Sequence, residues 1–314
     1  MNTETKERFH LKPKHKESLF ILSLVIIPLL NFAVFWVYVN IDTILLTFQT
    51  WDYQTASYKW YGIKRYVEVF TQYFSNTETY KAEFNTFINS FHAILINIII
   101  LPLAFIAAYG FYKKMPLEKF YRVTFYIPSL MSITALAMLF RYMFNADFGP
   151  LNKLFEAFGV SIEWLGPESP AMWSLIYIFC IWSGLGVNVI MMNSAMQRIP
   201  GDIAEYSKLE GVGFFREAFQ IVLPLVMPTV GIYIISVFAS VFTFTLQPML
   251  LAVTPGVDNR FLTIGWYIFR SVEGGNEQTM LHAATLGISF TIIMLPIIIL
   301  VRLIVNKLTP DVQF

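Results

Sequence analysis

The sequence has little charge, a single cysteine and few histidines, and each scarcity excludes a class of protein. Only 14% of the 314 residues are Asp, Glu, Lys or Arg, whereas 56% are hydrophobic and the mean hydropathy is +0.57. Because a soluble domain carries about 25% charged residues, we predict an integral membrane protein. Cys180 stands alone, so no disulfide can form within the chain. The net charge of +1 gives no indication of nucleic-acid binding.

Catalytic signatures are also missing. The four histidines, His10, His15, His92 and His282, form no HExxH pair, and the sequence contains neither a G-x-S-x-G turn nor a Walker A loop. His92 lies within an apolar run, where we interpret a single imidazole as a hydrogen-bonded packing group. We therefore expect no catalytic residue, no metal site and no cofactor in this chain.

Long apolar runs dominate what is present. Six stretches are long enough to cross a bilayer core of about 30 Å at about 1.5 Å per residue. They are Leu19–Val39, Phe87–Phe111, Tyr121–Phe144, Ala171–Met192, Leu225–Ala252 and Ala283–Val305. The first ends without the small-x-small pattern of a signal peptidase site, so we expect it to stay as a spanning helix. The predicted fold is all-α, a polytopic membrane protein with six transmembrane helices.

Basic residues divide unevenly between the two sides of this predicted bundle. With the amino terminus in the cytoplasm, fourteen of the 22 Lys and Arg residues fall on cytoplasmic segments. Cytoplasmic loops carry an excess of basic residues, so we predict a multi-pass plasma-membrane protein with both termini cytoplasmic. We divide the chain into a basic cytoplasmic arm at 1–18 and a transmembrane domain at 19–314. Within that domain, 40–85 is predicted to be extracellular and 196–224 to be a cytoplasmic loop.

Acidic residues are absent from the spans. None of the six stretches contains Asp or Glu, whereas a proton- or sodium-coupled carrier normally places an ionisable group inside the membrane. A transporter that lacks both such a group and a nucleotide-binding loop must take its energy from a partner. The alternative hypothesis is a stand-alone membrane carrier or a non-catalytic membrane assembly factor.

The segment between the fourth and fifth stretches has the pattern of a short, bounded helix. Asp202 is a good N-cap residue, and Glu205, three positions later, predicts a capping box. Gly211 is placed to take the left-handed conformation that ends a helix. Because an isolated helix of about two turns is marginal in water, this one needs a surface to dock on.

The second half of the loop predicts a helix with an apolar face. Phe215, Phe219 and Val222 recur at i, i+4 and i+7. Helices that lie on lipid are usually strongly basic on the polar face, whereas residues 198–217 carry three basic and four acidic residues. An anionic leaflet would repel such a loop, so docking on a protein is favoured over lying on membrane lipid.

A series of motif residues begins at the end of the fourth stretch. It comprises Met196-Gln197-Arg198-Ile199-Pro200, Glu205, Gly211, Phe219, Ile221, Leu223-Pro224 and Pro228. This series resembles the EAA loop of ABC importer permeases, in which E-A-A-x-x-x-G is followed nine residues later by I-x-L-P. Further matching pieces are Trp60 to Tyr66, Asn89-Ser90, Tyr121-Arg122, Ile127-Pro128, Gly149 to Asn152, Trp164-Leu165 and Trp182. The likeness covers the whole chain and points to sugar permeases of the maltose-transporter type.

The resemblance implies a type I ABC importer permease fold that works by alternating access. It implies a second homologous permease subunit, two ATP-binding cassette ATPases that hydrolyse ATP, an extracellular solute-binding protein and a sugar substrate. The residues it assigns to ATPase coupling are Asp202, Glu205, Tyr206, Ser207, Glu210, Gly211, Phe215 and Phe219. Tyr206 and Ser207 replace the two alanines of the family's name, and Glu210 replaces the usual Asp, which indicates an ATPase partner with a matching groove.

The fifth stretch supplies the candidate substrate path. Related permeases contribute solute contacts there, and the resemblance assigns Phe238, Phe242, Phe244 and Gln247 to the path. Aromatic faces suit the C–H faces of a sugar ring, and an amide can bond sugar hydroxyls. Packing against lipid or other helices is the equal alternative for the aromatic residues. Pro248 leaves a backbone carbonyl without its usual donor, which a membrane tolerates only beside a cavity or another helix.

Two extracellular segments are candidates for contact with the binding protein. They are Asn40–Asn85, which is rich in Trp and Tyr, and Gly256–Gly275. Most aromatic residues of the first segment, such as Trp51 and Trp60, are expected to anchor the chain at the membrane interface.

Overall fold

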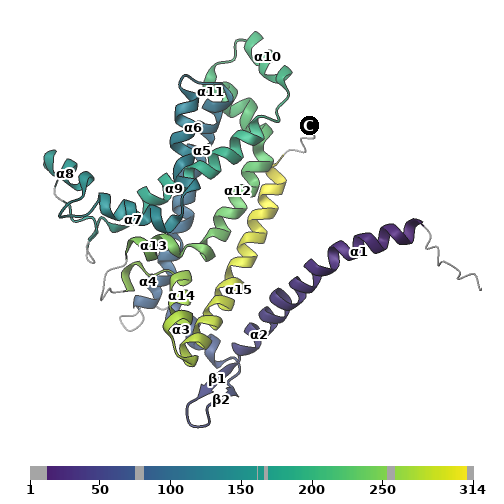
Figure 1. Ribbon diagram of the computed structural model, residues 1–314, viewed down its shortest axis with the longest axis vertical. Coiled ribbons are helices and arrows are strands. Elements are labelled where there is room, and N and C mark those ends of the chain that lie inside the picture. The colour runs from purple at the N-terminus through teal and green to yellow at the C-terminus, as the bar shows by residue number, and fades with distance from the viewer. Residues whose placement is uncertain (1–12, 75–80, 161, 166–168, 253–258, 310–314) are drawn as a thin grey trace, which may run out of the picture. The chain divides into compact units, whose positions relative to one another are not determined.

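The computed structural model describes residues 13–74, 81–160, 162–165, 169–252 and 259–309. The predicted arm at 1–18 and the two candidate extracellular segments lie partly outside these ranges. The chain divides into two units, Met1–Arg65 and Tyr66–Phe314. Helices make up most of each unit (Figure 1).

In the first unit one helical run carries the first predicted span. α1 (Pro13–Asn31), a π-helical segment η1 (Phe32–Tyr38) and α2 (Val39–Leu46) follow one another directly. Residues Phe20–Leu46 are long and apolar enough to cross a membrane, so the span extends beyond its predicted end. No residue of Phe20–Leu46 is buried within its own unit.

A two-stranded hairpin follows, although the sequence predicts an all-α chain. β1 (Gln49–Asp52) pairs antiparallel with β2 (Ser57–Trp60), and Trp51 lies opposite Tyr58. The rings of this pair meet edge to face, with centroids 4.9 Å apart. Because aromatic cross-strand pairs stabilise hairpins, residues that the sequence indicates only as interface anchors also build a small β element.

Local polar contacts close the turn of this hairpin. The Asp52 carboxylate accepts hydrogen bonds from the Gln54 amide and the Thr55 hydroxyl, both at 2.9 Å, and forms an ion pair with Lys59. The hydrogen bond from Lys59, together with those from the turn, holds the pKa of Asp52 below its usual value. The hairpin is therefore fixed by its own residues.

Among the described residues of the second unit, four further helical runs are long and apolar enough to cross a membrane. They cover Glu83–Tyr112, Met172–Met196, Phe214–Thr243 and Glu277–Leu308. Their elements are α4 (Lys81–Ser90), α5 (His92–Tyr112), α9 (Met172–Met196), α11 (Phe214–Glu217), η2 (Ala218–Val222), α12 (Leu223–Thr243) and α15 (Glu277–Leu308). They confirm the second, fourth and sixth predicted spans, with ends shifted by a few residues.

The third predicted span is not one straight helix. It consists of α6 (Glu118–Leu130) and α7 (Ile133–Met143), which meet at an angle of 107°. The break lies at Met131 and Ser132, whose ψ angles of 154° and 129° are extended. Apolar composition continues through the break, so a prediction from hydropathy joins the two helices into one.

The fifth predicted span is also interrupted. α12 ends at Thr243, and a short helix, α13 (Leu246–Leu251), begins after a break at Phe244 and Thr245. Pro248 lies in the first turn of α13, and the carbonyl four residues before it, that of Phe244, accepts a hydrogen bond from the Thr263 hydroxyl at 2.7 Å. The prediction of a single helix over Leu225–Ala252 is wrong. The carbonyl that Pro248 leaves without a backbone donor is satisfied by a side chain.

The core of the second unit forms where α5, α9 and α12 pack together. Ala104, Ala108, Phe179 and Val189 are fully buried there. A smaller apolar cluster joins α12 to α3 (Lys64–Phe74), α14 (Ile264–Gly274) and α15. The remaining short helices are α8 (Pro150–Ala157), α10 (Gly201–Leu209) and η3 (Asn259–Phe261).

Side-chain hydrogen bonds tie α4 to the segment before α14. The Asn89 amide donates to the carbonyls of Arg260 and Leu262 at 2.7 and 2.9 Å, and the Ser90 hydroxyl accepts from the Ile264 amide at 2.8 Å. Asn89 and Ser90 are among the residues that carry the family resemblance in the sequence, and these bonds give the pair a structural role.

The predicted cytoplasmic and extracellular segments of the second unit lie at opposite ends of it. The α5–α6 connection, α10 and the end of α15 lie at one end in Figure 1, and α3, α4 and α14 lie at the other. These three cytoplasmic candidates of the second unit therefore share one end of it, while their cytoplasmic orientation stays a prediction.

Candidate coupling site and substrate path

The helix α10 projects from the end of the bundle as part of a loop between α9 and α12 (Figure 1). It begins at Gly201, directly after Pro200, whose extended backbone (ψ 137°) makes it the N-cap. Asp202 lies inside the first turn, and no side chain caps the helix. The predicted capping box of Asp202 and Glu205 is therefore wrong, because the helix starts earlier than the side-chain pattern indicates. Asp202 still places its negative charge near the helix N-terminus, where the dipole favours it.

The end of α10 confirms the prediction for Gly211. This residue has φ +65°, in the left-handed region. Its amide donates to the Lys208 carbonyl at 3.1 Å, and the Val212 amide donates to the Ser207 carbonyl at 3.0 Å. These two bonds form a Schellman motif. The helix therefore has a defined end, and its length is fixed by a single glycine.

The two faces of α10 differ in exposure. Ser207 is 5% exposed and Ile203 packs against the main core. Tyr206 and Leu209 on the other side are 68% and 82% exposed. Asp202, Glu205, Lys208 and Glu210 are exposed as well. The free surface of α10 thus carries two large apolar side chains among charged ones, which suits a protein groove with an apolar floor.

The second half of the loop does not present the predicted apolar face. Phe215 is 72% exposed, Phe219 is 49% exposed with its ring centroid 5.9 Å from that of Phe105, and Val222 is only 2% exposed. The five residues of η2 are π-helical, so the regular spacing of an α-helix does not hold across them. The three side chains therefore differ in exposure and do not form one apolar face.

A buried ion pair fixes this part of the loop to α5, and sequence reasoning misses it. Lys113 Nζ lies 2.9 and 2.7 Å from the two carboxylate oxygens of Glu217, whose side chain is 5% exposed. Beside it, the Tyr109 hydroxyl donates to the Phe214 carbonyl at 3.2 Å, and the two rings are in contact. Opposite charges at the facing ends of two predicted helices are the one sequence signal that could have indicated the pair.

The residues predicted for the substrate path are not gathered at one surface. Phe238 and Phe242 lie half-buried on α12, and the Phe242 ring meets Phe290 with centroids 5.2 Å apart. Phe244 is 6% exposed at the break before α13 and belongs to the main core. Gln247 lies on α13, and its buried Oε1 accepts no hydrogen bond from the part of the chain that the structure describes. Gln247 is therefore the path candidate with an unused polar group.

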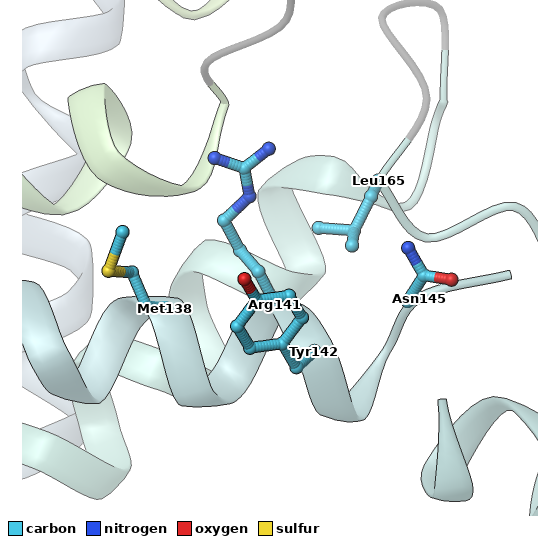
Figure 2. Close-up of a pocket in the computed structure, with 5 residues that line it drawn as sticks. All are labelled: Met138, Arg141, Tyr142, Asn145 and Leu165. Carbon is cyan, nitrogen blue, oxygen red and sulfur yellow. The ribbon is translucent and has the colours of Figure 1, made fainter. Parts of the chain in front are cut away.

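A cavity of about 220 Å³ opens beside α7, in a region that sequence reasoning does not single out. Its lining residues are Met138, Arg141, Tyr142, Asn145 and Leu165. Figure 2 shows the guanidinium of Arg141 between the side chains of Met138 and Leu165. Arg141 donates to the carbonyl of Leu250 at 3.4 Å, close to the end of α13. A cation at this position holds α7 against α13.

His92 confirms its interpretation as a packing group. Its imidazole stacks on Trp173 with centroids 3.8 Å apart, and Nδ1 is 2.8 Å from the Tyr177 hydroxyl. Both partners lie on α9, so His92 joins the start of α5 to that helix.

Comparison with known proteins identifies the family. Residues 100–314 match the family described as "Binding-protein-dependent transport system inner membrane component". The probable ABC transporter permease protein YurN of Bacillus subtilis is 28% identical over 233 residues, which are 73% of this chain and 77% of that protein. The diacetylchitobiose uptake system permease protein NgcF of Streptomyces coelicolor is 23% identical over 300 residues, which are 92% of this chain and 83% of that protein.

A solved structure shares the fold. A chain of a bacterial alginate ABC transporter, in complex with an alginate pentasaccharide-bound periplasmic protein, superposes with a TM-score of 0.77 at 17% identity. The superposition covers 94% of this chain and 96% of that chain. Residues 100–314, which match the family, contain α9, the loop with α10, and α12. This chain therefore belongs to the family of binding-protein-dependent ABC importer permeases.

Proposed function

We propose that this chain is the permease subunit of an ATP-driven sugar importer and that α10 is the helix on which an ATPase subunit docks. The observation that carries the proposal is the exposure of Tyr206 and Leu209 on a short helix with a fixed end at Gly211. A helix of nine residues is marginal alone, and its apolar outer surface is uncovered in the isolated chain. A protein groove would cover that surface and stabilise the helix.

The partners follow from what the chain itself lacks. ATP hydrolysis is assigned to two ATPase subunits, because the chain carries no nucleotide-binding loop. A second permease subunit completes the path. An extracellular binding protein delivers the solute, as the description of the family indicates. Both termini are placed in the cytoplasm, since α10 must face the ATPases.

The solute is assigned to the sugars and oligosaccharides. The relative NgcF is named for diacetylchitobiose uptake, and the solved neighbour belongs to an alginate transporter. In this chain Phe238, Phe242 and Gln247 offer aromatic surface and an amide oxygen without a hydrogen bond from a described residue. Phe244 would join the path only if the break before α13 opened, because its ring is buried.

The docking proposal is tested by disrupting the apolar surface of α10. Leu209→Asp places a charge in the expected groove without touching the bundle, since Leu209 is 82% exposed. Lys114→Gln, at an exposed position outside α10, is the control. Co-expressed ATPase should purify with the parent chain and with Lys114→Gln, and should be lost from Leu209→Asp. Equal recovery with all three chains would refute docking at α10.

The solute class is tested through the cognate binding protein. A panel of mono-, di- and oligosaccharides should include at least one that the binding protein binds and that the reconstituted importer accumulates in vesicles when ATP is supplied. Solute uptake driven by a proton or sodium gradient, without any ATPase, would support the stand-alone carrier instead.

A further inference from the structure

We propose that the Lys113–Glu217 ion pair is a tie, that is, a contact that makes α5 move together with the loop between α9 and α12 when an ATPase moves that loop. This inference rests on the proposed function of α10, because it assumes that an ATPase moves that helix. It assigns Lys113 and Glu217 as positioning residues for coupling, whereas docking itself belongs to α10.

The position of the pair is the first ground. Glu217 ends α11, which leads through η2 into the membrane span of α12, while Lys113 is the C-cap of α5. The pair therefore connects the end of one spanning helix to the beginning of another. The Glu217 carboxylate lies in the first turn of its helical run and Lys113 at the end of its own, so both charges also complement the helix dipoles.

The geometry is the second ground. Both carboxylate oxygens of Glu217 lie within 2.9 Å of Lys113 Nζ, and the side chains are 5% and 22% exposed. Charge-assisted hydrogen bonds of this kind are short and directional. An ion pair at the surface contributes little because water screens it, whereas this one is largely out of water. It therefore fixes the position and direction of the contact between α11 and α5, which an apolar contact leaves free to slide.

The neighbouring contacts are the third ground. Tyr109 is 1% exposed, its hydroxyl bonds the Phe214 carbonyl, and its ring lies 4.8 Å from that of Phe214. Tyr109 and Lys113 are one helical turn apart on α5, and Phe214 and Glu217 are one turn apart on the loop. Two adjacent contacts fix both the distance and the rotation of the loop on α5. Because α5 also packs along α9 and α12, a movement of α5 reaches the core of the bundle.

Stability alone does not account for a charged pair here. Replacing both partners of a buried ion pair by apolar residues is often neutral for stability, whereas removing one partner leaves an uncompensated charge. The double variant Lys113→Met/Glu217→Met therefore keeps the packing and removes the tie. The charge-reversed variant Lys113→Glu/Glu217→Lys keeps an ion pair between the same two positions, with the positive and negative charges exchanged. Lys114→Met removes the same charge at the adjacent exposed residue and is the matched control.

The experiment measures whether α5 responds to nucleotide in the assembled complex. The chain carries Cys180→Ser and Ile106→Cys, a position on α5 that is 53% exposed, and is purified with its ATPases and second permease. The rate of alkylation by N-ethylmaleimide is compared without nucleotide and with ATP plus vanadate. Co-purification of the ATPase is scored in parallel.

We expect a nucleotide-dependent change in rate of at least about threefold in the parent and in Lys114→Met. The double Met variant should keep its ATPase but lose most of that change, and the reversal should restore at least half of it. A full response in the double Met variant, or no response in the parent, would overturn the tie. If the proposed function of α10 were wrong, the result would be different: the ATPase would fail to co-purify with the parent chain, or it would still co-purify with Leu209→Asp.

Discussion

Replacing Gly211 by valine tests whether the fixed end of α10 matters for coupling. Gly211 has φ +65°, and apart from its chain neighbours no heavy atom of the described residues lies within 4 Å of the place where a Cβ would stand. A side chain therefore meets no steric obstacle, and any effect of the substitution comes from the backbone. Valine must either adopt the left-handed region or unwind the Schellman motif that joins Val212 to Ser207.

The magnitude follows from that geometry. A β-branched residue in the left-handed conformation costs about 1–2 kcal/mol, which lowers the population of the intact helix end by a factor of about 5 to 30. Because α10 has only nine residues and depends on its ends, we expect it to tilt or fray. The solute path lies in the bundle and should be unaffected.

Two measurements check this expectation. Co-purification of the ATPase and ATP-driven uptake in proteoliposomes should both fall for Gly211→Val. Gly211→Asn is the control at the same position, since asparagine tolerates the left-handed region, and it should retain most of both activities. Wild-type assembly and uptake by Gly211→Val would refute α10 as the coupling element.

Three further predictions concern orientation, charge and the substrate path. In a Cys180→Ser chain, Ser57→Cys, which is exposed on β2, should react with an impermeant thiol reagent in intact cells. Lys114→Cys, at an exposed position outside α10, should react only after permeabilisation, and the opposite pattern would reverse the orientation. Glu205→Gln and Glu205→Ala should reduce ATPase co-purification to the same extent. No side chain caps α10, so Glu205 can contribute only through a contact between its charge and the ATPase. Normal co-purification of the Gln variant would contradict such a contact. Gln247→Leu removes a buried oxygen that accepts no hydrogen bond from a described residue. The variant should therefore unfold at an equal or higher temperature than the parent, while its sugar uptake should fall. Unchanged uptake would show that Gln247 is not part of the substrate path.

Hydropathy and charge were sufficient to predict the class of protein and most of its spans. Apolar runs without acidic residues must lie in a membrane, since each backbone polar group there has to be satisfied within a helix. The length of such a run sets where a helix can cross, which is why the second, fourth and sixth spans are close to their predicted bounds. The position of Gly211 was likewise readable, because few residues other than glycine adopt φ +65° at low cost.

Hydropathy does not indicate where a helix bends or ends within an apolar run, so two of the predicted single helices are wrong. The runs Tyr121–Phe144 and Leu225–Ala252 stay apolar across the points where the chain changes direction, yet the structure bends one by 107° and breaks the other at Phe244. The side chain that satisfies the freed carbonyl at the second break is Thr263, nineteen residues further along the chain. A contact between residues so far apart leaves no local pattern in the sequence that could predict it.

The candidate site divides in the same way. The sequence by itself determined that a short helix between two spans ends at Gly211, because helix ends and their capping glycine are local properties. Only the tertiary structure decided that Asp202 lies inside the first turn, that Val222 is buried, and that Lys113 meets Glu217 across a separation of 104 residues. Pairing of charges depends on how spanning helices pack, and packing is set by the whole core rather than by the residues that it brings together.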